Sequence, residues 1–235
     1  MNQESSKRQI EVMAKLLSTN NLQAEINRRH FHQYRCLTIN VIGSPGAGKT
    51  TLLERTLGEL SDSVQVGVIE GDIFTSKDAD RIAVYNVPVV QINTGGGCHL
   101  DSKMVGNVLP RFDWAKLELL IIENVGNLVC PAEFDLGEEF KVVVLSIVEG
   151  DDKPSKYPVI FRNAKAVVLN KMDLEPFTEV ELNKMKEDIL MINPAMIIFE
   201  VSCRTKEGLT DWTTWLQLQV GKFRETEGES RGLLI

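Results

Sequence analysis

The chain has 235 residues, 43% of them hydrophobic and 25% charged, and this ordinary globular composition excludes a disordered or collagen-like protein. The net charge of −7 argues against a nucleic-acid partner, which selects a basic surface. The longest apolar run, residues 195–199, is far shorter than the ~20 residues of a membrane-spanning helix. Four cysteines without a disulfide framework and a polar first segment without a signal peptide predict a cytoplasmic protein with no membrane partner.

In chain order, the sequence divides into an N-terminal helical extension (1–35), one α/β domain (36–220) and a polar C-terminal tail (221–235). The extension carries Ile10, Met13 and Leu17 at helical spacing. The tail has few apolar residues to bury, so we expect it to fray.

Seven runs of strand-forming residues alternate with helix-like segments in the domain. They are residues 36–43, 64–72, 87–94, 117–125, 141–148, 164–171 and 196–203. Several are continuously apolar, as expected for strands covered on both faces. The alternation predicts an α/β fold with a mostly parallel sheet of about seven strands and helices on both faces. In such sheets ligands bind beyond the carboxyl ends of the strands.

The first strand is followed by a phosphate loop of the P-loop NTPase type. The predicted nucleotide-binding residues are Gly43, Ser44, Pro45, Gly46, Ala47, Gly48, Lys49, Thr50 and Thr51. Backbone N–H groups and the N-terminus of the next helix would surround phosphate oxygens. Lys49 is expected to reach the β- and γ-phosphates as a catalytic residue, and the Thr50 hydroxyl to ligate magnesium.

Two strand-end carboxylates are the other candidates for catalysis. Asp72 ends the second strand and Glu123 the fourth, so both should face the γ-phosphate. We interpret them as magnesium ligands, in direct or water-mediated contact. The alternative for each is a solvated carboxylate at the end of a strand.

The base site is predicted from Asn170-Lys171-Met172-Asp173, which follows a late strand at the position of the Asn-Lys-x-Asp motif of Ras-like GTPases. The Asp173 carboxylate can accept two hydrogen bonds from guanine that adenine cannot donate. Lys171 can cover the base plane, and Asn170 can fix the loop. Ser202, Cys203 and Arg204 resemble the backbone loop that holds guanine O6. The sequence therefore predicts GTP and GDP as the nucleotides.

Cys98, His99 and Cys130 form a candidate metal site embedded in the domain. Both segments leave carboxyl ends of predicted strands, on the edge where the nucleotide binds. Two thiols and an imidazole suit nickel or zinc. Three ligands are one short of a closed site, so water or a second subunit must supply more. The alternative is that the cysteines are merely small buried hydrophobic residues, as we expect for Cys36 and Cys203.

Together these motifs resemble the HypB family of hydrogenase maturation GTPases, from about Thr38 to Leu216. The resemblance rests on GSPGAGKTT, EGDIFTSKDADRI, QINTGGGCHLD, ENVGNLVCP, EGDDKPSKYP, NKMD and VSCRTKEG, in that order. It implies a GTP-hydrolysing metallochaperone that assists nickel insertion, acts with other maturation factors on the precursor of the hydrogenase large subunit, and forms a homodimer favoured by GTP or metal. Its metal site would lie near the dimer interface and use Cys98, His99 and Cys130. The Cys-rich or His-rich N-terminal run of many members is missing from this sequence, so tight N-terminal nickel capture is not expected.

Three other functions compete with this interpretation. A urease-type nickel accessory GTPase would use the same nucleotide chemistry, but its usual Cys-Pro-His motif is absent here. A non-catalytic protein could bind metal under the control of a nucleotide that it does not hydrolyse. An ATP-dependent small-molecule kinase is disfavoured by the Asn-Lys-x-Asp motif.

Overall fold

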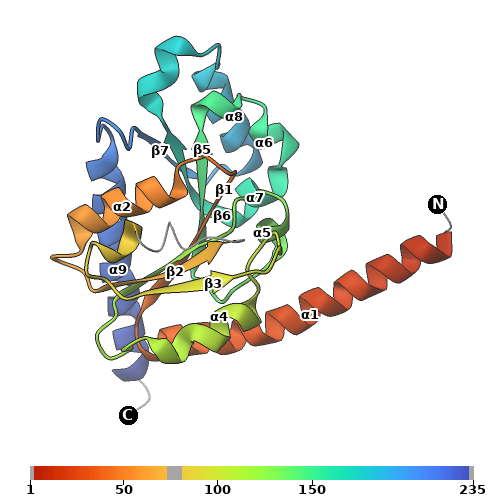
Figure 1. Cartoon of the computed structure of the whole chain (residues 1–235), viewed down its shortest axis with the longest axis vertical. Coiled ribbons are helices and arrows are strands. Elements are labelled where there is room, and N and C mark those ends of the chain that lie inside the picture. The colour runs from red at the N-terminus through yellow and green to blue at the C-terminus, as the bar shows by residue number, and fades with distance from the viewer. Residues whose placement is uncertain (1–2, 73–80, 233–235) are drawn as a thin grey trace.

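The computed structural model describes residues 3–72 and 81–232. Within these residues, seven strands form one sheet in the order β3-β2-β4-β1-β5-β6-β7, and each neighbouring pair is parallel (Figure 1). The strands are β1 (Leu37–Gly43), β2 (Val66–Asp72), β3 (Val89–Asn93), β4 (Leu119–Glu123), β5 (Phe140–Ser146), β6 (Ala164–Asn170) and β7 (Ile197–Val201). The sheet confirms the predicted α/β fold.

The central strands owe their continuous apolar sequences to cover on both faces. β4 and β5 are buried at every position. Any side chain of such a strand loses water on folding, whichever face it occupies, so apolar residues are favoured throughout. The edge strand β3 instead alternates between buried and less buried positions.

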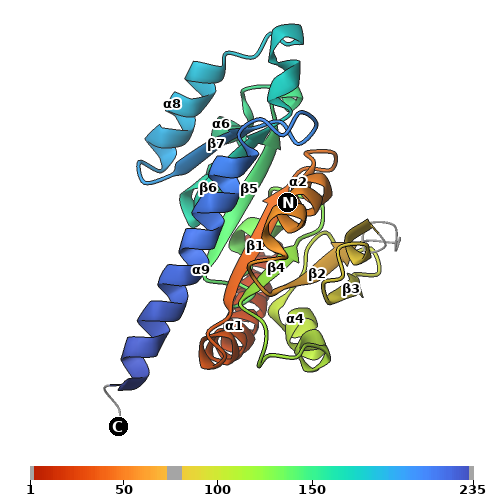
Figure 2. The same ribbon diagram turned by 90° about the vertical axis from the view of Figure 1, so that its left-hand side faces the viewer.

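Helices lie on both sides of the sheet, as predicted. The described helices are α1 (Gln3–Gln33), α2 (Lys49–Leu60), α4 (Ser102–Val108), α5 (Cys130–Glu133), α6 (Lys153–Lys156), α7 (Pro158–Asn163), α8 (Leu182–Ile192) and α9 (Leu209–Gly232), with 3₁₀ turns at Leu109–Arg111, Ile147–Glu149 and Met172–Phe177. α2 and α9 pack on one face through Leu53, Leu57 and Trp212 (Figure 2). α4 packs on the other face beside β3 and β4, and α7 and α8 beside β5 and β6.

Helix α1 joins the molecule through its C-terminal half. Ala24 and Phe31 are buried, and Phe31 belongs to the core that α4 covers. The N-terminal half extends past the end of α4 and beyond the rest of the molecule (Figure 1). The extension is therefore not a separate appendage, because its last turns are part of the packing around the sheet.

The structure corrects the expectation of a frayed tail from Gly221. Helix α9 continues to Gly232. Phe223 packs against the core and its ring lies 5.1 Å from that of His32. Arg224 pairs with Glu118 at 3.1 Å, and Glu227 contacts His32 Nδ1 at 2.9 Å. These tertiary contacts stabilise a helix that its polar composition alone would not favour.

All predicted sites lie along the carboxyl edge of the sheet. The phosphate loop follows β1, Asp72 and Glu123 end β2 and β4, and Asn170 ends β6. Residues 73–80 (IFTSKDAD), which are part of the EGDIFTSKDADRI motif, lie outside the described residues.

Candidate nucleotide and metal sites

The phosphate loop connects β1 to the N-terminus of α2. Gly48 precedes the helix with φ +96°, a left-handed conformation in which side chains are strained. Lys49 Nζ donates to the carbonyl oxygens of Gly43 and Ser44, at 3.3 and 3.4 Å, so its cation lies over the loop. A negatively charged group in the loop would meet this cation and the N-terminus of α2 together.

A pocket of about 540 Å³ lies next to the loop, and oxygen atoms from three segments meet there. Thr50 Oγ1 donates to Glu123 Oε1 at 2.8 Å, and Asp72 lines the same pocket. Pro45, Gly46, Gly48, Lys49, Thr50 and Thr51 also line it, while Gly43, Ser44 and Ala47 complete the loop behind them. Carboxylate and hydroxyl oxygens are the donors that magnesium prefers, so the residues present fit this ion.

Two further residues that line this pocket were not predicted from the sequence. Glu70 lies opposite Glu123 in the β2–β4 register and is buried. Alternation along β2 places Glu70 on the same face as Asp72, and that signal could have found it. Arg81 pairs with Glu54 at 2.7 Å and donates to Thr51 Oγ1 at 3.2 Å. Arg81 belongs to the EGDIFTSKDADRI motif, but its place in that motif does not indicate a contact with the phosphate loop.

Asn170 and Lys171 connect the predicted base loop to the phosphate loop. Asn170 Nδ2 donates to the carbonyl oxygen of Ala47 at 3.0 Å, and its Oδ1 accepts from the N–H groups of Lys171 and Cys203. Lys171 Nζ donates to the carbonyl oxygen of Gly46 at 2.8 Å. The fully buried Asn170 thus holds three loops together at one edge of the sheet.

Asp173 lies in a second pocket, of about 370 Å³, next to the phosphate loop. Its Oδ1 accepts a hydrogen bond from Ser202 Oγ at 2.7 Å. Cys203 and Arg204 line the same pocket, with Arg55 donating to the Cys203 carbonyl oxygen at 2.9 Å. Arg55 had no recognisable signal in the sequence. The structure thus brings together the residues predicted to hold a base, beside those predicted to hold phosphates.

Cys98, His99 and Cys130 come together beyond the ends of β3 and β4. Their potential ligand atoms all lie within 4.8 Å of one another. Cys98 Sγ is 3.1 Å from Cys130 Sγ and 3.5 Å from His99 Nδ1. The His99 ring packs on Phe134 with a centroid distance of 4.0 Å. A single ion with thiolate bonds of ~2.3 Å could contact both sulfurs after a small displacement.

The local environment affects the ligand atoms of this cluster differently. The hydrogen bond to Cys130, and then burial, raise the pKa of the Cys98 thiol. Burial lowers the pKa of His99, so its imidazole is neutral near pH 7 and has a lone pair for a metal ion. Outside the cluster, burial raises the pKa of the Cys36 thiol to about 12 and that of the Cys203 thiol to about 11. Cys36 and Cys203 are buried, as expected, and unreactive as thiolates.

The segment between β4 and Cys130 connects the metal cluster to the phosphate loop. Asn127 forms a β-bridge with Gly43, and its Nδ2 donates to the Cys98 carbonyl oxygen at 3.2 Å. A Cβ atom on Gly126 would lie 3.0–3.1 Å from atoms of Pro45, so the segment packs tightly against the phosphate loop. The same segment therefore contacts both the phosphate loop and the backbone of Cys98.

The chain resembles known proteins over most of its length. A family model described as "CobW/HypB/UreG, nucleotide-binding domain" matches residues 37–200. Hydrogenase maturation factor HypB of Escherichia coli (strain K12) is 47% identical over 215 residues, which cover 92% of this chain and 74% of that protein. The chain belongs to the HypB family. Another HypB, from Rhizobium leguminosarum bv. viciae, is 46% identical over 93% of this chain and 73% of its own length.

Solved HypB structures have the same fold as this family member. HypB from Archaeoglobus fulgidus matches with a TM-score of 0.81 and 37% identity, over 86% of this chain and 99% of that one. HypB from Helicobacter pylori, solved in complex with nickel, matches with a TM-score of 0.82 and 35% identity, over 87% and 96%. HypB membership agrees with the resemblance drawn from the motifs. No helix among the described residues of this HypB chain is long and apolar enough to cross a membrane.

Proposed function

We propose that this HypB-family chain is a magnesium-dependent GTPase that carries nickel during hydrogenase maturation, with metal binding coupled to the nucleotide state. The observation that carries the proposal is the Asn127 segment, which contacts both the phosphate loop and Cys98. A protein that used only one of the two sites would have no need of this connection.

The phosphate pocket supports hydrolysis of GTP to GDP and phosphate. Lys49 and the N-terminus of α2 stabilise negative charge on the β- and γ-phosphates. Thr50, with Glu123 behind it and Asp72 nearby, would hold magnesium, which neutralises phosphate charge when bound. Asp72 orients the attacking water, whose oxygen bonds to the γ-phosphorus as the bond to the β–γ bridging oxygen breaks. The water protons end on the phosphate product and solvent.

The base pocket supports guanine as the base. The Asp173 carboxylate, oriented by Ser202, accepts from the guanine N1–H and 2-amino groups. Lys171 covers the base plane with its aliphatic stem, and Arg204 lines the same pocket. An adenine base would leave the carboxylate without those donors.

Cys98, His99 and Cys130 are the proposed ligands for the metal cargo. We favour nickel over zinc because a related HypB was solved in complex with nickel. Three ligands leave coordination positions that water or a second copy of the chain fills, which favours a homodimer. In the cytoplasm, the other maturation factors and the precursor of the hydrogenase large subunit are the proposed partners in delivery.

A single-turnover assay tests the hydrolytic part of the proposal. The wild-type protein with magnesium should convert bound GTP to GDP and phosphate, and Lys49→Ala should reduce the rate at least ~100-fold. His32→Gln, far from the pocket, is the control. A wild-type protein that binds GTP without converting it would instead be a nucleotide-gated metal-binding protein.

Nickel titration tests the cargo site. Cys98→Ala, His99→Ala and Cys130→Ala should each weaken nickel binding, while His32→Gln removes an imidazole outside the cluster and should bind nickel like the wild type. Unchanged nickel affinity in all three variants would place the cargo site elsewhere.

A further inference from the structure

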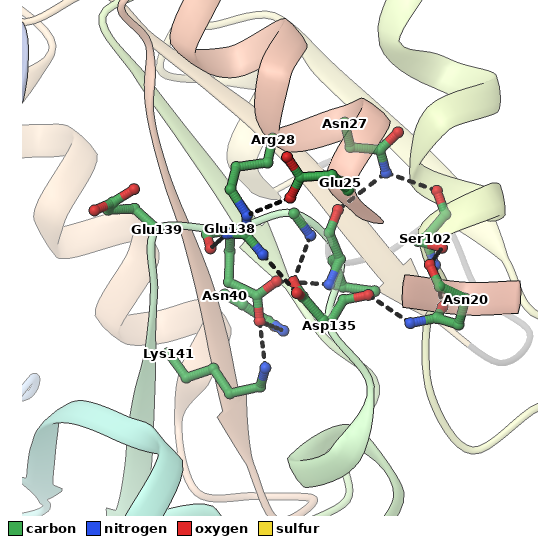
Figure 3. Close-up of polar contacts among 12 residues, drawn as sticks. Asn20, Glu25, Asn27, Arg28, Asn40, Ser102, Asp135, Glu138, Glu139 and Lys141 are labelled. Atoms are coloured by element: carbon green, nitrogen blue, oxygen red, sulfur yellow. Dashed lines mark hydrogen bonds and ion pairs between the residues drawn. The ribbon is translucent and has the colours of Figure 1, made fainter. Parts of the chain in front are cut away.

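Two asparagines on one face of α1 are buried, although more than half of the helix residues whose burial is described (15–33) are exposed. Asn20 and Asn27 are two turns apart, and their side chains are 7% and 1% exposed. Asn27 Nδ2 donates to the carbonyl oxygens of Ser102 at 2.8 Å and Leu136 at 3.0 Å (Figure 3 shows the bond to Ser102). One carboxamide therefore bridges two segments that are 34 positions apart in the sequence.

Asn20 makes a second bridge between the same segments. Its Nδ2 donates to the Asp135 carbonyl oxygen at 2.7 Å, and its Oδ1 accepts from the Ser102 N–H at 2.9 Å (Figure 3). The Ser102 hydroxyl donates to the Asn20 carbonyl oxygen at 2.7 Å. Asn20 and Asn27 together form what we call the asparagine clamp.

The two segments held by the asparagine clamp are those that carry the metal cluster. Ser102 is the first residue of α4, three positions after His99. Asp135 directly follows Phe134, on which the His99 ring packs, and Phe134 ends the helix that begins at Cys130. The clamp thus joins the segment that carries Cys98 and His99 to the segment that carries Cys130.

The 135–138 loop is fixed closely against α1. Arg28 donates to the Glu138 carbonyl oxygen at 2.6 Å and pairs with Asp135 (Figure 3). Gly137 has φ +95°, and a Cβ atom there would lie 2.6 Å from the Ala24 carbonyl oxygen. The loop therefore packs directly against the backbone of the helix.

We propose that Asn20 and Asn27 are positioning residues for the metal site, and that α1 sets the separation of the Cys98–His99 pair from Cys130 through them. The proposal rests on the metal-binding role given above to these three residues. Without the clamp, α4 and the 135–138 loop lose their shared anchor. The unbound thiols would then sample wider separations, and an ion would have to restore the close arrangement.

The first experiment measures the separation of the thiols without any metal. Glutathione disulfide oxidises the Cys98 and Cys130 thiols to one disulfide and is itself reduced to two molecules of glutathione. The equilibrium constant reports how closely the two sulfurs, 3.1 Å apart, are held. Cys36 and Cys203 are buried thiols of raised pKa and should not react on this timescale. Asn20→Ala and Asn27→Ala should lower this constant about tenfold relative to wild type.

The second experiment measures nickel affinity of the same variants by competition with a chelator. We expect a loss of ~10-fold or more, as for other residues that orient metal ligands. Asn21→Ala is the matched control, since Asn21 is the exposed neighbour of Asn20 on the same helix. Alanine favours helix more than asparagine does, so a loss would not come from a weaker α1.

Ser102→Ala keeps the proposal testable if the asparagine variants fold poorly. It removes only the hydroxyl bond to Asn20 and should produce a smaller loss in both measurements. The proposal would be overturned if well-folded Asn20→Ala and Asn27→Ala proteins had the same thiol equilibrium and nickel affinity as the wild type. If Cys98→Ala itself retained full nickel affinity, the cargo site would fail, while the thiol equilibrium would still test the clamp.

Discussion

At the scale of single residues, Asp173 is the side chain that we propose selects the base. Its carboxylate accepts from the Ser202 hydroxyl, which fixes one oxygen and directs the group toward the base pocket. Hydrogen bonds to a charged group are worth about 1.5–3 kcal/mol each. In the proposed function, two such bonds to guanine favour GTP over ATP.

Asp173→Asn should weaken GTP and GDP binding about 100-fold. The amide keeps the size of the side chain but offers one acceptor and a donor where guanine presents two donors. Xanthine nucleotides should bind better, because the new amide can donate to the 2-oxo group. Fluorescence titration with GDP and xanthosine diphosphate measures both effects. Wild-type affinity for GDP in the variant would place the base in another pocket.

Asp72 and Glu70 lie on the same face of β2, and their variants separate turnover from binding. Asp72→Ala should slow magnesium-dependent hydrolysis about 100-fold and leave GDP affinity nearly unchanged, because the γ-phosphate is absent from GDP. Glu70→Gln should affect the same step if Glu70 contributes charge to the pocket. Single-turnover rates and GDP titrations are compared for each variant. Equal loss of turnover and of GDP binding in Asp72→Ala would mean a structural role.

The candidate site could be predicted residue by residue only where chemistry and spacing were local. The phosphate loop, Asp173 and the Cys98–His99 pair have recognisable patterns, and the fold brings them to one edge of the sheet. Arg55 reaches the base pocket through tertiary packing, which no local pattern reports, and the EGDIFTSKDADRI motif does not by itself assign Arg81 to the phosphate pocket. His30 likewise has no distinguishing pattern in the sequence, yet it is half-buried against Trp114, with ring centroids 4.5 Å apart.

At the scale of elements, the segment from residue 124 to residue 129 is the one that connects the two sites. Val129 N–H donates to Asn127 Oδ1, so this side chain also holds the backbone just before Cys130. Asn124 Oδ1 accepts from the N–H of Leu100, next to His99. In the proposed coupling, a change at the γ-phosphate that moves Glu123 would reach both segments that carry the cluster.

Nickel affinity should differ between the GTP- and GDP-bound states, and nickel should change nucleotide affinity by the same factor. Asn127→Ala should bring the two nickel affinities closer together, since it removes the contact with Cys98. Calorimetric titration with GDP and a non-hydrolysable GTP analogue measures the factor, which is typically about 5–150-fold in coupled systems. Cys98→Ala serves as the reference in which nickel binding is lost and GDP binding is retained. Identical nickel affinities in both states of the wild type would mean that the two sites are independent.

Most helices and strands were predictable from the sequence. The C-terminal end of α9 was not, and its contacts explain why. Seven runs of strand-forming residues were recognised, and the several that are continuously apolar mark strands covered on both faces. The last turns of α9 lack such a pattern. Phe223, Arg224 and Glu227 keep them helical through partners at positions 32 and 118, far away in the sequence.

At the scale of the whole molecule, stability should depend on pH through His30. Burial lowers the pKa of His30, which lies among Phe31, Tyr34 and Trp114. The unfolded chain therefore binds a proton at a higher pH than the folded one. The stability from a neutral His30 is fully present above the unfolded pKa of ~6.5 and is lost as pH falls toward the folded pKa.

His30→Phe removes this titration while keeping an aromatic ring beside Trp114. Urea unfolding at pH 7.5 and pH 5.5 should show a smaller fall in unfolding free energy for the variant than for the wild type. His32→Phe, on the opposite side of the helix end, does not alter the Trp114 contact and serves as the comparison. Equal falls in His30→Phe and the wild type would show that His30 does not contribute.

The strand order affects how the chain folds while it is being synthesised. β1, which carries the phosphate loop, pairs with β4 and β5, and these strands begin at residues 119 and 140. Among the strands described before residue 100, only β2 and β3 are neighbours. A nascent chain therefore holds β1, which is buried along its whole length in the fold, without a partner until more than half of the protein has left the ribosome. Such non-local pairing makes folding slow and exposes an unpaired strand edge to aggregation. The strand order therefore leaves the strand that precedes the phosphate loop unpaired until β4 has been synthesised.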